Sequence, residues 1–162
     1  MKTMYKKIVM RSAMLLMALG LVFGISSCRS DDNGTPNPGL PSGNKYKITF
    51  TLNGVDPNDN VSFSLAGTNT SADTNVWKIN GQTQAGQMGI GLTDDNFTGS
   101  TKTYVIESNF PIVSIASGLN IVNYNPGTIT GSIKIEKGGN EVVNQPINLT
   151  TDGATFSKQY NL

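Results

Sequence analysis

The sequence contains no histidine, the side chain that most often acts as general base or metal ligand at neutral pH. It has one cysteine, so it can form neither an intramolecular disulfide nor a zinc-ligand set. Ser-His-Asp triads are excluded because they require histidine. These absences leave little enzyme chemistry open, and we expect no enzymatic activity, no catalytic residue and no cofactor.

Acidic residues are absent before Asp31, whereas four basic residues lie among the first eleven positions. An apolar run of 14 residues, from Ser12 to Ile25, follows this basic start. A permanent transmembrane helix needs about 20 apolar residues. The segment is therefore typical of a cleaved secretory signal peptide, with an uncleaved N-terminal anchor as the alternative.

The apolar run ends in Ile25-Ser26-Ser27-Cys28, which resembles the lipobox of bacterial lipoproteins. Ile25 replaces the more usual leucine, and Ser27 replaces glycine or alanine. The resemblance implies that Cys28 receives diacylglycerol, that signal peptidase II cleaves between Ser27 and Cys28, and that the new amino group is acylated. Two or more acyl chains anchor a protein stably, whereas one binds reversibly. The resemblance covers about 28 residues and implies nothing about the domain behind them.

The residues after the cysteine, Ser30-Asp31-Asp32, resemble an acidic signal that directs lipoproteins of one group of Gram-negative bacteria to the cell surface. The alternative interpretation is a solvated polar tether. The sequence thus predicts an outer-membrane protein that is held by lipid on Cys28 and exposed at the cell surface, with the periplasmic face of the outer membrane as the alternative.

The chain from Cys28 onward has eight lysines and arginines against eleven acidic residues, a net charge of −3. This balance argues against nucleic acid as a partner and against a polybasic lipid-binding patch. The stretch 33–44 contains three prolines and three glycines and has few apolar residues, which is typical of a flexible linker. We therefore expect a signal peptide at 1–27, a lipidated cysteine and tether at 28–44, and a single domain at 45–162.

Apolar and polar residues alternate with period two through much of this domain, for example in 45–53, 61–67 and 129–137. Clusters of Gly, Asn, Asp and Pro separate the apolar runs, and Gly138-Gly139 sits in the clearest hairpin. About eight short strands at such spacing predict an all-β, antiparallel sandwich, immunoglobulin-like or a related Greek key. A small β-barrel is the alternative. Pro146 predicts an edge strand, or one that starts after Gln145, because proline cannot donate to a strand ladder.

Trp77 is the only tryptophan and is the one candidate ligand-binding residue, because an exposed indole could stack on a sugar. Its apolar neighbours Val76 and Ile79 favour the other interpretation, a side chain that anchors the core. Tyr124 raises the same question more weakly. Glu107 could point inward, but one such carboxylate does not form the pair that glycoside hydrolysis requires.

Four acidic loop residues are weak candidates for calcium ligands, because oxygen ligands on loops at one end of a sandwich can bind the ion. They are Asp56, Asp59, Asp94 and Asp95. Turn chemistry explains each of them equally well, and we expect no metal site.

The sequence therefore predicts a non-catalytic binding module for a glycan, a peptide or an envelope protein. A structural accessory subunit that adds a strand to a larger envelope assembly is the alternative. A hydrolase is the least favoured possibility.

Overall fold

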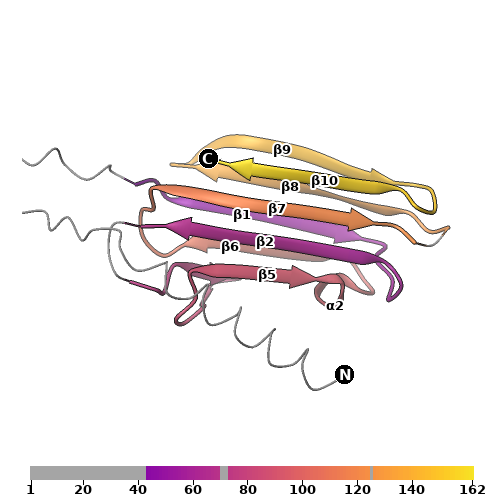
Figure 1. The fold of residues 1–162 in the computed structure, drawn as a ribbon, viewed down its shortest axis with the longest axis horizontal. Helices are drawn as coiled ribbons and strands as arrows, with labels where there is room; N and C mark the ends of the chain where they lie inside the picture. The colour runs from indigo at the N-terminus through magenta and orange to yellow at the C-terminus, as the bar shows by residue number, and fades with distance from the viewer. Residues whose placement is uncertain (1–42, 70–72, 125) are drawn as a thin grey trace, which may run out of the picture. The chain divides into compact units, whose positions relative to one another are not determined.

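The computed structural model describes residues 43–69, 73–124 and 126–162 and shows two antiparallel β-sheets packed face to face (Figure 1). One sheet has six strands in the order β4-β3-β6-β1-β8-β9, and the other has four in the order β10-β7-β2-β5. The six-stranded sheet contains β1 (Tyr46–Asn53), β3 (Trp77–Ile79), β4 (Gln82–Thr83), β6 (Lys102–Ser108), β8 (Ile129–Lys137) and β9 (Asn140–Leu149). The four-stranded sheet contains β2 (Asn60–Thr68), β5 (Gly89–Thr93), β7 (Ser114–Val122) and β10 (Thr155–Asn161).

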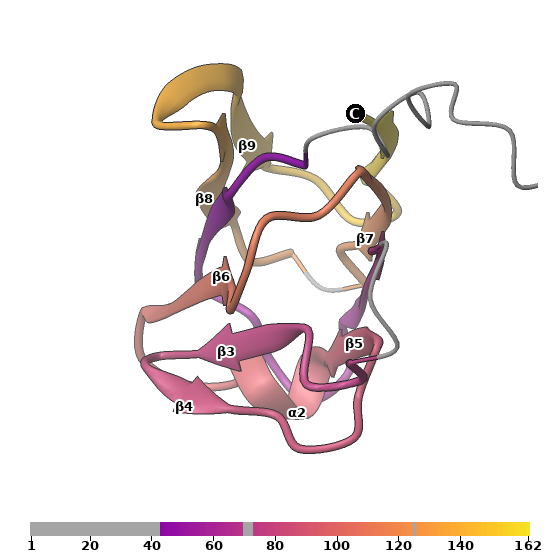
Figure 2. The same ribbon diagram turned by 90° about the vertical axis from the view of Figure 1, so that its left-hand side faces the viewer.

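The predicted antiparallel sandwich is confirmed, and the two sheets do not close into a barrel. Figure 2 views it from one end, with β8 and β6 on one side and β7 and β5 on the other. The strands number ten rather than about eight, and two of them, β3 and β4, form a hairpin of only three and two residues. A one-turn helix, α2 (Asp94–Phe97), follows β5. No helix among the described residues has the length and apolar character needed to span a membrane.

The core lies between the sheets and is built from the alternate apolar positions that define the strands. In β1, Tyr46, Ile48, Phe50 and Leu52 are all buried, while the residues between them face outward. The Phe50 ring packs against that of Phe97, with centroids 4.7 Å apart. Such aromatic pairs contribute about 0.5–1.5 kcal/mol beyond their buried area, so α2 helps to close one end of the core.

The hairpin predicted around Gly138-Gly139 joins β8 to β9, and Lys137 pairs with Asn140 across it. Both glycines have positive φ, 58° and 83°, as the two central residues of a type I′ turn require. Pro146 lies within β9, and β9 is the outermost strand of its sheet, which confirms the predicted edge position.

The strand directions give the sandwich two distinct ends. Asn44 pairs with Ile112, and Leu162 exchanges hydrogen bonds with Ile115, so the first described residues and the C-terminus lie at one end (Figure 1). We call this end the near pole. The connections from β1 to β2, from β5 to β6, from β7 to β8 and from β9 to β10 lie at the opposite end, the far pole.

Candidate functional site

Charged side chains cross the outer face of the six-stranded sheet close to the near pole. Cross-strand register places Lys78 of β3 beside Glu107 of β6, and Glu107 beside Lys47 of β1. Lys47 is in turn the neighbour of Glu136 on β8. We call these four residues the charged row, and their charges alternate in sign from one strand to the next.

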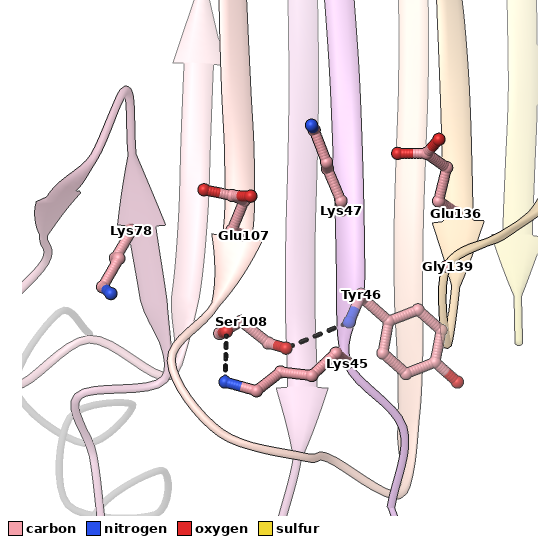
Figure 3. Close-up of a pocket in the computed structure, with 8 residues that line it drawn as sticks. All are labelled: Lys45, Tyr46, Lys47, Lys78, Glu107, Ser108, Glu136 and Gly139. Carbon is pink, nitrogen blue, oxygen red and sulfur yellow. Dashed lines mark hydrogen bonds between the residues drawn. The ribbon is translucent and has the colours of Figure 1, made fainter.

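The charged row lies in a shallow cavity of about 370 Å³, which Lys45, Tyr46, Ser108 and Gly139 also line. Figure 3 shows Glu107 between Lys78 and Lys47. The Tyr46 amide donates to Ser108 Oγ over 3.0 Å, and the Lys45 ammonium donates to the Ser108 carbonyl over 3.3 Å and to the Asn109 carbonyl. These bonds hold the end of β1 against the end of β6 and fix the base of the cavity.

Of the four residues in the charged row, only Glu136 forms an ion pair within the described part of the chain. Lys134 forms ion pairs with Glu136, at 2.9 Å, and with Glu141, at 3.3 Å. The hydrogen bond from Lys134 holds the pKa of Glu136 below its ordinary value, with a smaller contribution from the charge of Lys47. Within the described part of the chain, Lys47, Lys78 and Glu107 form no ion pair, so their charges remain available to a partner.

The electrostatics of the row do not favour Glu136 as a general acid. A glycosidase general acid needs a raised pKa so that it is protonated at neutral pH. The pKa of Glu136 is shifted in the opposite direction, and Lys47 stands between Glu136 and Glu107. Glu107 lies on the outer face of β6, between the inward Ile106 and Ser108, so the expectation that it could point inward is wrong. The row presents charges of both signs, and Lys47 separates its two carboxylates.

Trp77 is fully buried, with 0% of its surface exposed, and its Nε1 donates to the Met88 carbonyl over 2.9 Å. Its ring also packs so closely over Gly67 that a Cβ there would lie 2.8 Å from Trp77 Cζ2. A ring in this position cannot stack on a sugar. The assignment of Trp77 as a ligand-binding residue is therefore wrong, and the core interpretation is correct.

The four weak calcium candidates all lie at the far pole, in two separate groups. Asp59 is buried, and its carboxylate accepts the amides of Asp56 and Tyr124, each over 2.9 Å. Asp94 and Asp95 occupy the first turn of α2, where helix geometry favours negative charge. No three acidic, cysteine or histidine side chains among the described residues come close enough together to hold a metal ion.

Large exposed apolar side chains are few in the described ranges: Tyr124 is 57% exposed, Met88 46% and Val142 45%. Tyr124 follows β7 at the far pole, whereas Met88 precedes β5 at the near pole. Val142 lies on the edge strand β9. Tyr124, considered only weakly from the sequence, is thus the exposed aromatic ring that the structure offers in place of Trp77.

The outer face of the four-stranded sheet differs sharply from that of the six-stranded sheet. Its outward positions carry only small or uncharged side chains, among them Ser64, Ala66, Gly91, Ala116 and Gly118. A shallow hollow of about 560 Å³ runs across it. Charge on the outer sheet faces of the described chain is therefore confined to the six-stranded side.

The residues predicted for lipid attachment and export lie outside the described ranges. They are Ser27, Cys28, Ser30, Asp31 and Asp32. Their roles remain predictions from the sequence.

Comparison with known proteins relates the fold to solved structures. No protein-family model matches the chain, and no curated protein matches it. A DUF4425 family protein from Bacteroides ovatus superimposes with a TM-score of 0.53 at 11% identity, over 74% of this chain and 94% of that one. A Parabacteroides distasonis protein, solved by NMR in a calcium-bound form, superimposes with a TM-score of 0.55 at 15% identity, over 80% of this chain and 100% of that one. A DUF4425 domain of unknown function from Bacteroides vulgatus superimposes with a TM-score of 0.55 at 13% identity, over 76% of this chain and 96% of that one. At these identities the likeness concerns the fold alone.

The charged row was missed in the sequence because its members lie on four strands that are far apart along the chain. Each strand shows only one of these charges at an outward position near its end, which is common on any solvated sheet. The signal lies in the register between strands, and that register depends on pairings such as Lys47 with Glu107 and with Glu136.

Proposed function

We propose that this chain is a lipid-anchored, non-catalytic binding protein of the bacterial outer membrane. It is held by acyl chains on Cys28 and displays the sandwich at the cell surface, where the far pole binds a glycan, a peptide or another envelope protein. The proposal combines the lipobox-like sequence with the positions of the two poles.

The observation that carries the proposal is the direction of the chain. The segment 28–44 leads into the near pole, and a fully extended chain of its 17 residues spans at most about 60 Å. Lipid on Cys28 would therefore attach the domain through its near pole, and the far pole is the end farther from that point of attachment. Tyr124 is exposed at that pole, and aromatic rings are common anchors in binding sites.

The alternative of a strand-adding accessory subunit is less well supported, because the long sheet edges are protected. In β9, Pro146 interrupts the free edge and the ladder has a bulge opposite Ile135 and Glu136. In β10, Lys158 lies in the middle of the strand on the side of the core-facing residues. Proline, bulges and inward-pointing charges are the devices that prevent edge-to-edge pairing.

Ligand binding at the far pole is tested with Tyr124→Ala, using Met88→Ala as the matched control. The full chain, extracted in detergent, is applied to an array of defined bacterial and host glycans. We expect Tyr124→Ala to weaken binding about 2- to 10-fold, the effect of losing one aromatic contact. Met88→Ala removes an exposed side chain at the near pole and should leave binding unchanged. Equal binding by the wild type and Tyr124→Ala would contradict a glycan site at this pole.

Calcium binding is not part of the proposed function, although a protein of similar fold was solved in a calcium-bound form. Calcium takes six to eight oxygen ligands, and both oxygens of Asp59 already accept backbone amides. We expect the unfolding temperature to be the same in calcium chloride as in EDTA. A rise that grows with calcium concentration would reveal a site, because a ligand of the folded state stabilises it by mass action.

A further inference from the structure

We propose that the charged row is a contact surface for a second copy of this chain, which docks face to face in a two-fold symmetric dimer. In a symmetric interface, residue i of one copy meets residue j of the other, and j meets i. The row, taken across the sheet from β3 to β8, has the charges plus, minus, plus, minus. Taken in the opposite direction, from β8 to β3, the charges are minus, plus, minus, plus. A second copy that faces the first in this reversed order therefore presents an opposite charge at every position, and the row is complementary to itself.

The pairing that results is specific. The two-fold axis runs parallel to the strands, in the space between the two facing sheets, and passes over the gap between β6 and β1. Rotation about this axis places Lys47 of each copy opposite Glu107 of the other. The same axis places Lys78 of each copy opposite Glu136 of the other. Neighbouring strands are about 4.8 Å apart, so the four charges extend over roughly 14 Å and meet four opposite charges.

Other axes give poorer matches. An axis between β1 and β8 would place Glu107 opposite Glu141 of the second copy, because Glu141 is the neighbour of Glu136 on β9. An axis perpendicular to the strands would place each charged residue opposite the same residue of the second copy. Like charges in such positions are repulsive. Charge complementarity therefore selects one axis.

The alternation also matches ordinary pairing within the sheet, where opposite charges on adjacent strands attract. Within the described residues, however, Lys47, Lys78 and Glu107 make no ion pair with one another. Figure 3 shows them side by side along the cavity. Their hydrogen-bonding groups are therefore free to meet a facing surface.

The selected axis has a second consequence, which rests on the proposed lipid anchor. Rotation about an axis parallel to the strands keeps both near poles at the same end of the dimer. The two tethers would then lead to one membrane, and both far poles would point away from it. An axis perpendicular to the strands would direct the two anchors in opposite directions. The arrangement selected by charge is thus also one that two copies in a single bilayer can adopt.

Such a dimer should be weak and sensitive to salt. Exposed ion pairs are individually weak, and salt screens them over about 8–10 Å at physiological ionic strength. Anchoring in one membrane raises the effective concentration of the two copies and compensates for low affinity.

The test uses charge reversal in the full chain extracted in detergent, with association measured by sedimentation equilibrium at low salt. Lys47→Glu alone and Glu107→Lys alone should each weaken self-association about tenfold or more, because each change affects two symmetry-related contacts. Lys158→Glu makes an equal charge change on β10, outside the row, and should associate like the wild type.

The decisive measurement mixes the Lys47→Glu and Glu107→Lys variants under different affinity tags. In a mixed dimer, the carboxylate introduced in one copy faces the ammonium introduced in the other across the axis. Opposite charges therefore meet again, and co-purification of the two tags should return to the wild-type level. A misfolded variant could not be rescued in this way.

The proposal is overturned if the wild type is monomeric at all concentrations, or if the mixture associates no better than each variant alone. Palmitate labelling of the same preparations reports lipid attachment separately. Failure of the anchor and failure of the dimer are therefore distinguishable.

Discussion

Replacing Cys28 with alanine is expected to abolish incorporation of labelled palmitate and to leave an unprocessed precursor. The thiol is the acceptor of diacylglycerol in the lipoproteins that the segment resembles, and it is the only thiol in the chain. The measurement is metabolic labelling with palmitate, followed by a comparison of the size of the product. Undiminished labelling of Cys28→Ala would refute the lipoprotein assignment.

A variant with Asp31 and Asp32 both replaced by alanine serves as the control, because it changes nearby residues and leaves the acceptor intact. It should incorporate palmitate like the wild type. If the acidic stretch is an export signal, the variant should also lose its sensitivity to protease on intact cells. Unchanged sensitivity would favour the simple polar tether.

Replacing Trp77 with alanine is expected to lower the free energy of unfolding by about 3–5 kcal/mol, the usual result of truncating a buried Trp or Phe. The side chain is fully buried, and its loss would leave a cavity beside Ile112 and Gly67. It would also leave the Met88 carbonyl without the indole donor. Urea denaturation followed by circular dichroism measures the effect, since Trp77 is the only tryptophan and its fluorescence would be lost.

Trp77→Phe separates packing from hydrogen bonding. Phenylalanine retains most of the buried ring but cannot donate to Met88, so we expect a smaller loss of about 1–3 kcal/mol. Val142→Ala truncates an exposed side chain on β9 and should be close to neutral. A Trp77→Ala variant as stable as the wild type would mean that the indole is not part of the core.

The fold class followed from the sequence because alternation along a strand is a local property. The buried series of β1 was visible in the order of its residues, and the β8–β9 hairpin was visible in Gly138-Gly139. The two-residue strand β4 and the one-turn helix α2 were not predicted, because such short elements carry too little periodicity. The edge position of Pro146 was predicted correctly, because a missing amide hydrogen has the same consequence in any sheet.

The candidate sites also differ in how much of each could be predicted from the sequence. Cys28 could be identified from four consecutive residues, and the sequence alone supports its role. Trp77 was left open between core and ligand, and its burial required the second sheet to be in place. The charged row needed the register of four strands, and the exposure of Tyr124 needed the positions of the loops around it.

The sequence by itself therefore determined the class of fold, the expected means of attachment and the absence of histidine chemistry, since these depend on composition and on neighbours along the chain. Tertiary structure decided that Trp77 is core, that the long edge strands β9 and β10 are protected, and that the charged row is continuous across four strands. The physical reason is that strands of this sandwich pair with partners far along the chain, as Tyr46 of β1 does with Lys137 of β8. Contacts over such separations depend on which registers bury the apolar face of every strand at once, and no single segment contains that information.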